Sequence, residues 1–394
     1  MLIDLDHTPP SRPAPPRRFR GPKWVVPIVL ALSLGGAQVP AEARILRPSV
    51  VSAERAVTWM LHDGVFYSLH SRPQDGVLEL QARRVPSSDP LWTRMVDAAG
   101  EVPRLRMAGP YLALRFGAEM LLLDVETGRA RWQDDDNSTA WPAGDDVLLW
   151  TPEGRIGLLD AGTGSIRWRK EVKAEPIGVT GTERHVQVLY DDGSAVAYGR
   201  ETGEVANTVA GLAVRPAEID GFGRLVDDGL PALMAMGDLA IVFSPDRIAA
   251  LRLPTLEQLW TARLPLPAGA ARCGERLCVL HGNGMTAFDQ NSGAPLWSGT
   301  EWTTWSGTLA GSPAGRVARV DPDTGRVVRD LGMGRLSGSV LIRTGGDRTG
   351  VFDQVSGDLR AIIPAGFLWC DGPGDQISCQ GAGSSVTVWR IPKT

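Results

Sequence analysis

The sequence has few of the residue clusters that nucleic-acid-binding proteins and enzymes carry. Its formal net charge is −4 over 394 residues, and it contains no run of basic residues, which argues against a nucleic-acid partner. It contains no Gly-x-Ser-x-Gly, Walker or haem-attachment motif. The five histidines are scattered without the spacing of metal ligands: His7, His62, His70, His185 and His281. The sequence therefore predicts no catalytic, cofactor-binding or metal-binding residues.

Cysteine is also scarce, and the four cysteines form two close pairs. Cys273 and Cys278 flank one turn-like stretch, and Cys370 and Cys379 flank another. Two facing strands joined by a short turn bring Cβ atoms within bridging range, so we expect two local disulfides. Zinc binding and free buried thiols are the alternatives, although neither pair is Cys-x-x-Cys and no histidine is adjacent. Disulfides would indicate an oxidising compartment.

Long apolar runs are absent apart from one near the N-terminus. Residues 1–23 are rich in Pro and Arg, which predicts a disordered cytoplasmic tail. Residues 24–39 carry no charge, and the positive-inside rule places the chain after them outside the cytoplasm. We expect residues 24–43 to form a signal-anchor helix, which would make this a single-pass protein of the cell membrane.

Two alternatives to the anchor remain open. The apolar run is short for a membrane span, and Ala41-Glu42-Ala43 resembles a signal-peptidase site, so a cleaved signal peptide and a secreted protein form the first. A buried core helix is the second. No cysteine follows the apolar run, so a lipid anchor is not predicted.

A phrase that does recur is Asp-x-x-Thr-Gly-x-x-x-Trp. Its Thr or Ser falls at positions 87, 127, 163, 202, 255, 292, 324 and 356, a period of about 40 residues that is typical of propeller repeats. Its Asp and Gly are turn residues, and its Trp predicts packing between neighbouring units. The structural repeat residues are Asp124, Gly128, Trp132, Asp160, Gly164, Trp168, Trp260, Asp289, Gly293, Trp297, Asp321 and Asp353.

Alternating apolar runs surround each copy and predict strands, so the chain is expected to be all-β. We expect residues 44–394 to form a single β-propeller of about eight four-stranded blades, with seven or nine as alternatives. The last unit lacks a final strand, and residues 45–51 are placed to supply it. The seventh and eighth units are short and are expected to have reduced outer strands.

One interval, from Thr202 to Thr255, is longer than the others. Insertions in a repeat form loops on one face, and such a face is often a binding face. The excess carries apolar residues that we expect to form a partner-contacting loop: Phe222, Leu225, Leu230, Leu233 and Met234. The alternative is a solvated connection whose apolar residues pack on the rim of the ring.

The phrase at Asp124–Trp132, Asp160–Trp168 and Asp289–Trp297 resembles the repeat of the PQQ-like (pyrroloquinoline-quinone-type) β-propellers. That superfamily includes quinoprotein alcohol dehydrogenases and a non-enzymatic branch containing the propeller lipoprotein of the outer-membrane assembly machine. The dehydrogenases have adjacent, disulfide-bonded cysteines and calcium-ligating acids, which this sequence does not match. The resemblance therefore implies the non-enzymatic branch, although the lipidated cysteine of that lipoprotein is absent here.

Together these features predict an extracytoplasmic, non-catalytic propeller that binds a protein or envelope ligand as a scaffold. No cofactor and no nucleic acid are expected, and the membrane is a partner only if the N-terminal segment stays uncleaved. A PQQ- or metal-dependent oxidoreductase is the alternative, with a lyase or hydrolase on a propeller as a further one.

Overall fold

The computed structural model divides between Ala43 and Arg44, and every described strand lies in the unit Arg44–Thr394. The described residues are 50–51, 56–72, 77–85, 89–97, 103–116, 119–134, 138–160, 163–214, 232–337, 340–345, 348–354, 357–364, 367–371, 375–381 and 385–391. The expected tail and signal-anchor segment lie outside them. Within the described ranges, no helix is long and apolar enough to cross a membrane.

The described residues form nine antiparallel sheets of four strands each, which we number as blades 1 to 9. Blade 1 contains β2 (Ala56–His62), β3 (Val65–Arg72), β4 (Val77–Arg84) and β5 (Pro90–Asp97). Blade 2 contains β6 (Arg104–Ala108), β7 (Tyr111–Phe116), β8 (Glu119–Asp124) and β9 (Ala130–Asp134). Blade 3 contains β10 (Thr139–Ala143), β11 (Asp146–Thr151), β12 (Arg155–Leu159) and β13 (Ile166–Glu171).

The next three blades follow in chain order. Blade 4 contains β14 (Pro176–Gly181), β15 (His185–Tyr190), β16 (Ala195–Gly199) and β17 (Val205–Val209). Blade 5 contains β18 (Leu233–Met236), β19 (Leu239–Phe243), β20 (Arg247–Arg252) and β21 (Glu257–Arg263). Blade 6 contains β22 (Pro267–Cys273), β23 (Arg276–His281), β24 (Gly284–Phe288) and β25 (Pro295–Gly299).

The last three blades include the one that joins both ends of this unit. Blade 7 contains β26 (Thr304–Ser306), β27 (Leu309–Gly311), β28 (Arg316–Val320) and β29 (Val327–Met333). Blade 8 contains β30 (Arg335–Ser337), β31 (Val340–Gly345), β32 (Arg348–Asp353) and β33 (Leu359–Pro364). Blade 9 contains β34 (Phe367–Asp371), β35 (Gln376–Gly381), β36 (Val386–Arg390) and β1 (Val50–Val51).

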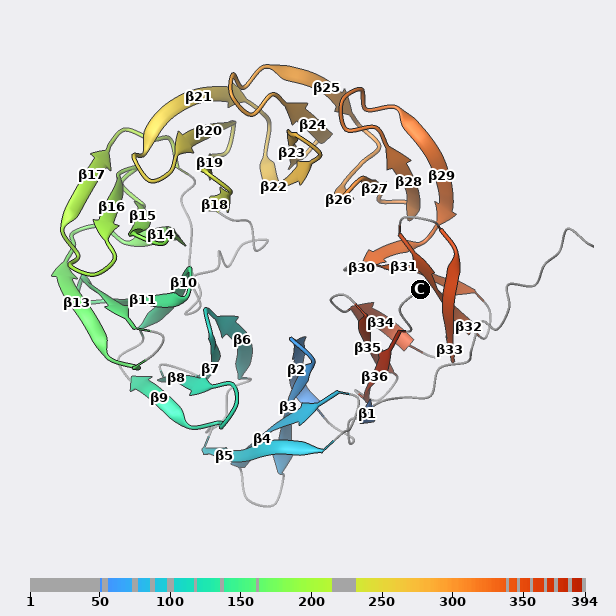
Figure 1. Ribbon diagram of the computed structural model, residues 1–394, viewed down its shortest axis with the longest axis horizontal. Coiled ribbons are helices and arrows are strands. Elements are labelled where there is room, and N and C mark those ends of the chain that lie inside the picture. Colours follow the sequence, from blue (N-terminus) through green and yellow to red (C-terminus); the bar gives the residue numbers. More distant parts are fainter. Residues whose placement is uncertain are drawn as a thin grey trace, which may run out of the picture. The chain divides into compact units, whose positions relative to one another are not determined.

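Within this unit the sheets succeed one another around a ring, with the first strand of each blade nearest the centre (Figure 1). The ring closes as expected, because β1 pairs with β36 and supplies the missing strand of the last blade. Nine blades were one of the alternatives to the expected eight. The eight repeated hairpins account for blades 1 to 8, and the final partial unit becomes the ninth when β1 joins it.

Blades 7 and 8 correct one expectation, since both have full outer strands. Their outer strands β29 and β33 have 7 and 6 residues, whereas β26, β27 and β30 have 3 residues each. These two repeat units are therefore shorter than the others because their strands near the centre are short. A short strand suffices there because the blades converge and less surface has to be covered.

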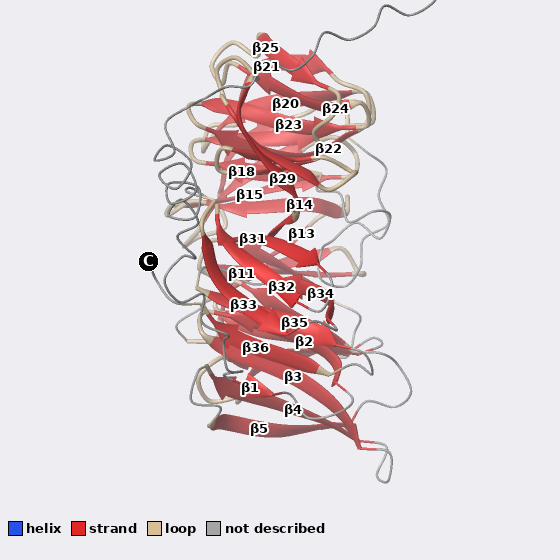
Figure 2. Ribbon diagram, turned by 90° about the vertical axis from the view of Figure 1, so that its right-hand side faces the viewer, coloured by secondary structure: helices blue, strands red, loops and turns tan. Residues whose placement is uncertain are grey.

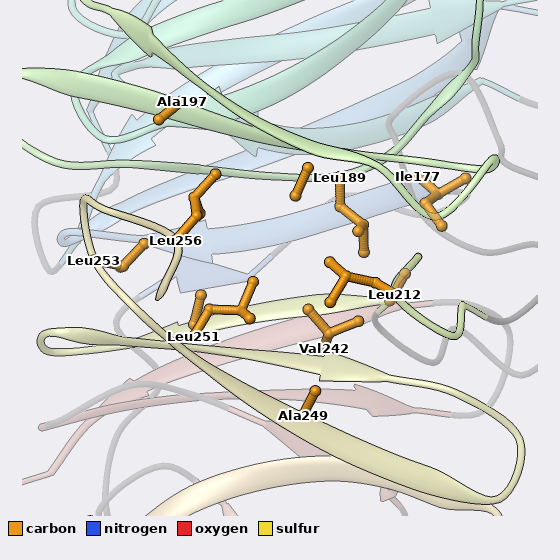
Figure 3. Close-up of a cluster of buried hydrophobic side chains, with 12 residues drawn as sticks. Ile177, Leu189, Ala197, Leu212, Val242, Ala249, Leu251, Leu253 and Leu256 are labelled. Carbon is orange, nitrogen blue, oxygen red and sulfur yellow. The ribbon is translucent and has the colours of Figure 1, made fainter. Parts of the chain in front are cut away.

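Nine buried hydrophobic clusters hold the described blades together, each between two neighbours. Alternate side chains of a strand point to opposite faces of its sheet. Apolar residues at both odd and even positions therefore pack against the neighbouring blade on each side. The cluster between blades 4 and 5, for example, includes Leu189, Leu212 and Val242 (Figure 3). The closing joint is small, with Phe66 and Val85 against Val386 and Val388.

The antiparallel order gives the ring two distinct faces. The turn from third to fourth strand, which carries the repeated phrase, emerges on the same side as the turn from first to second; we call this side the hairpin face. The remaining turns and the links between blades emerge on the opposite, connection face. Figure 2 shows the described parts as strands joined by loops running between these two sides.

Both expected disulfides are present. Cys273 is bonded to Cys278 and Cys370 to Cys379, and no cysteine is free. Each bond joins the innermost strand of its blade to the second, across the β22–β23 and β34–β35 hairpins.

Candidate functional site

The repeated aspartate organises the hairpin that contains it. Asp124 Oδ1 accepts hydrogen bonds from Thr127 N at 2.9 Å and from Thr127 Oγ1 at 2.8 Å. Asp160 and Asp289 bind Thr163 and Ser292 in the same way. Asp321 accepts from a backbone N–H of its own turn, and Asp353 shares the backbone pattern. The carboxylates of Asp124, Asp160, Asp289 and Asp321 are therefore occupied within their turns.

The glycine of each phrase has a positive φ, as the turn requires. The φ values of Gly128, Gly164 and Gly293 lie between 66° and 72°. This region strains any residue with a Cβ atom. Gly128, Gly203 and Gly293 also sit under tryptophan rings; a Cβ atom added to Gly203, for example, would lie 2.7 Å from Trp168 Cδ2.

Four tryptophans join blade to blade in one repeated way. Each donates its Nε1–H to the carbonyl one residue after the Asp position of the next hairpin, at 2.8–2.9 Å. The pairs are Trp92 with Val125, Trp168 with Arg200, Trp260 with Gln290, and Trp297 with Pro322. The rings of Trp168, Trp260 and Trp297 thus have the packing role that the repeat indicates.

Trp132 occupies the same register but packs differently. It is half-buried against the cluster between blades 2 and 3, and the stem of Arg131 covers Gly164 instead. The ring lines a pocket of about 200 Å³ together with Leu149, Gly157 and Arg169. The sequence repeat gave no sign of this difference.

A second departure lies between blades 4 and 5, where both partners of the tryptophan–glycine pair are replaced. Asn207 stands at the tryptophan position of β17, and its side-chain amide donates to Thr255 O. Leu256 stands at the glycine position, keeps a φ of 58°, and is only 2% exposed. Its side chain fills the space of the missing ring, beside Leu253 in Figure 3.

Polar side chains line a pocket at the joint between blades 5 and 6. This pocket, of about 460 Å³, lies between β21 and the strands of blade 6. His281 Nε2 lies 3.0 Å from Thr286 Oγ1, which lies 2.8 Å from Ser298 Oγ. The backbone N–H of Asn283 donates to His281 Nδ1 at 3.2 Å. We call His281, Thr286 and Ser298 the hydroxyl row.

The hydroxyl row is not arranged as a nucleophile with its base. Because Nδ1 accepts from Asn283, the proton of neutral His281 sits on Nε2, which then donates to Thr286. Burial lowers the pKa of His281 below its usual value and favours this neutral form. An imidazole that donates cannot take the hydroxyl proton, so the geometry does not support acyl transfer here.

The described residues also offer no metal centre, since they contain no group of three or more His, Cys, Asp and Glu side chains that could hold an ion. The two disulfides link cysteines 5 and 9 residues apart rather than neighbours. The described residues therefore do not assemble the adjacent disulfide-bonded cysteines and the calcium-ligating acids of the quinoprotein alcohol dehydrogenases.

The expected partner loop is corrected in part. Leu233 and Met234 belong to β18, the innermost strand of blade 5, and pack against the clusters on its two sides. They are part of the fold because β18 has to cover the inner edge of β19. Phe222, Leu225 and Leu230 lie outside the described residues.

Comparisons with known proteins identify a family whose pattern matches more than half of the chain. The family described as outer membrane protein assembly factor BamB matches residues 117–219 and 191–351. The outer membrane protein assembly factor BamB of Bordetella pertussis (strain Tohama I) is 23% identical over 263 residues, which cover 63% of this chain and 62% of that protein.

Two solved structures are also similar. BamB from Moraxella catarrhalis is 17% identical, with 88% of this chain and 100% of that chain covered and a TM-score of 0.49. The C-terminal WD40 domain of Sif2 is 12% identical, with 89% and 99% covered and a TM-score of 0.48. Because the family match spans most of the ring, the chain belongs to the family of the outer membrane protein assembly factor BamB.

Proposed function

We propose that this protein is a non-catalytic, protein-binding propeller of the cell envelope that acts in outer membrane protein assembly. The observation that carries the proposal is the family match, which extends from residue 117 to residue 351 and so covers blades 3 to 7 entirely. The chain spans about 62% of the length of the curated relative, so the partner and the location are part of the proposal.

The chemistry of the described residues supports a binding role. The repeated Asp and Gly residues are used by their turns, and three of the repeated tryptophans are used between blades. His281 is a donor within its row and not a base. The described residues contain no group of three or more His, Cys, Asp and Glu side chains that could form a calcium site of the quinoprotein kind.

The two disulfides support a position outside the cytoplasm, where such bonds persist. We propose that the propeller is held at the envelope and that residues 24–43 either anchor it or direct its export. Peptide mapping of the N-terminus of the mature protein would decide between anchorage and cleavage.

A deletion strain tests the proposed function directly. Quantitative mass spectrometry of isolated outer membranes should show a fall in β-barrel proteins, and the full-length gene should restore them. A matched gene lacking residues 1–43 should not restore them, because its product stays in the cytoplasm. Unchanged β-barrel levels would contradict the proposal.

A second assay addresses the oxidoreductase alternative. Purified full-length protein is mixed with PQQ and calcium, then examined for a bound chromophore and for dye-linked alcohol oxidation. We expect neither signal. Saturable PQQ binding with turnover would replace the binding function with an enzymatic one.

A further inference from the structure

The pocket between blades 5 and 6 differs from its counterpart between blades 2 and 3 in a way that the fold does not require. At the register positions of His281, Thr286 and Ser298, blade 3 has Thr151, Gly157 and Arg169. Blade 3 packs without a hydroxyl row, so the row is an addition to the repeat. Places where a chain departs from its own local rules are where functional sites are expected.

The hydrogen bonds of the row run in one direction. Asn283 N–H fixes His281 Nδ1 as the acceptor, so Nε2–H donates to Thr286 Oγ1. Either hydroxyl could donate in the contact between Thr286 and Ser298, but Thr286 is buried, and Ser298 Oγ is the acceptor that the described side chains offer its single proton. The proton of Ser298 is left to donate outward, and Ser298 has no further hydrogen-bond partner within the described residues.

The environment of the row is buried at one end and open at the other. Thr286 is 5% exposed, whereas Ser298 is exposed at the mouth of the pocket. Leu264 and Phe288, both buried, contribute the apolar lining. A ligand that enters here meets the Ser298 donor at the mouth and the apolar lining of Leu264 and Phe288 deeper in the pocket.

A positive charge lines the opposite side of the same pocket. Arg263, the last residue of β21, is exposed and has no ion-pair partner in the described part of the chain. The carboxylate of Asp246 accepts its hydrogen bonds, of 2.9 and 3.0 Å, from Arg247, which contributes most to lowering its pKa, and Arg263 adds only a smaller electrostatic contribution. Arg263 can therefore serve a ligand.

We infer that this pocket binds a carboxylate carried on an apolar stem. The stem contacts Leu264 and Phe288, and the carboxylate accepts hydrogen bonds from Ser298 and Arg263. A volume of about 460 Å³ admits either an acidic side chain of a bound protein or a free organic acid. Both sources share the chemistry that the pocket recognises.

Calorimetric titration of the full-length protein with small probes tests the inference. Hexanoate should bind in the millimolar range and hexanamide more weakly, since only the acid pairs with Arg263. Arg263→Gln should lower the affinity for hexanoate roughly fivefold and leave the affinity for hexanamide unchanged, as expected for an exposed ion pair. Ser298→Ala should weaken both probes roughly fivefold, through the lost hydrogen bond.

Thr286 acts as a positioning residue and has its own test. Thr286→Val removes the hydroxyl that orients Ser298, so this variant should bind hexanoate as weakly as Ser298→Ala does. Thr286→Ser restores the hydroxyl and should restore binding, which a purely structural effect of the smaller residue would not do. The matched control for Arg263→Gln is Arg169→Gln, because Arg169 is an exposed arginine that lines the other pocket, at the blade 3 register position of Ser298, and this variant should bind like wild type.

The source of the carboxylate is decided by a peptide arm. N-acetyl-Leu-Glu-amide binding more tightly than hexanoate assigns the pocket to a protein partner, and the reverse assigns it to a free acid. Equal binding of hexanoate and hexanamide would overturn the inference, as would wild-type binding by Ser298→Ala. The inference goes beyond the proposed function and does not rest on it, because a deletion strain with normal β-barrel levels would leave these titrations unchanged.

Discussion

Replacing Trp168 by alanine probes how neighbouring blades are held together. The ring of Trp168 is 7% exposed, lies 5.6 Å from the ring of Tyr198, and donates to Arg200 O at 2.9 Å. Truncating a buried aromatic costs about 3–5 kcal/mol, and this value includes the lost contacts and the cavity. We therefore expect Trp168→Ala to lower the free energy of unfolding by that amount.

Trp132→Ala is the matched control, since Trp132 has the same register and the substitution is chemically identical. Its ring is half-buried, and its indole N–H has no acceptor among the described residues. Losing half of the apolar burial of a large side chain costs about 1–2 kcal/mol. The difference between the two variants isolates the tryptophan–glycine packing.

A double-mutant cycle adds the glycine partner. Gly203→Ala forces a Cβ atom toward Trp168 Cδ2 at a φ of 68°, so backbone strain and overpacking should together cost about 2–4 kcal/mol. In the Trp168→Ala background only the strain of about 1–2 kcal/mol remains. The interaction energy should therefore be about 1–2 kcal/mol.

Urea unfolding followed by fluorescence and by circular dichroism supplies these values, provided the two transitions coincide. Equal costs for Trp168→Ala and Trp132→Ala would refute the reasoning, because it assigns the energy to packing rather than to residue type. An additive cycle would refute it too, since the two residues would then not be in contact.

The remaining predictions concern other parts of the ring. Asn207→Trp alone should cost about 1–3 kcal/mol by overpacking against Leu256, and Leu256→Gly in the same chain should recover most of it, as measured by urea midpoints. Replacing Cys370 and Cys379 by serine should lower the free energy of unfolding by about 2–3 kcal/mol, because the loop between them is no longer closed in the unfolded chain. Peptide mapping of the wild-type protein without reductant should show both native bonds. Burial alone would raise the pKa of Asp124, but hydrogen bonds from Arg131 and Thr127 lower this pKa overall. The ionised Asp124 therefore stabilises the fold fully above the pKa of the unfolded state, about 4, and this stabilisation is lost as the pH falls from there through the lower pKa of the folded state. Asp124→Asn should therefore flatten acid unfolding in that window, and an unchanged acid transition would count against the turn role. Replacing residues 215–231 by a Gly/Ser linker should leave the ring folded by circular dichroism and weaken crosslinking to the envelope partner, whereas extending the replacement through Met236 should unfold blade 5 because it removes β18.

Local chemistry could be predicted from the sequence alone. The repeated Asp, Thr and Gly form the same turn wherever they occur, because an Asp carboxylate capping N–H groups and a Gly at positive φ need only neighbouring residues. The two disulfides were predictable for the same reason, since each joins strands separated by a short turn. The closure of the ring by residues near Val50 followed from counting strands, because a blade with a missing strand has an edge to cover.

Tertiary structure alone decided what depends on how two blades meet. Trp132 and Trp168 have the same place in the phrase, yet only Trp168 covers the next glycine, because Arg131 lies over Gly164 in the other joint. The hydroxyl row combines residues from three strands, and its proton order depends on one backbone N–H. Leu233 and Met234 looked like loop residues because blade 5 follows a long interval. Sequence spacing fixes which residues share a turn, whereas packing between sheets depends on the shapes of side chains far apart in the chain.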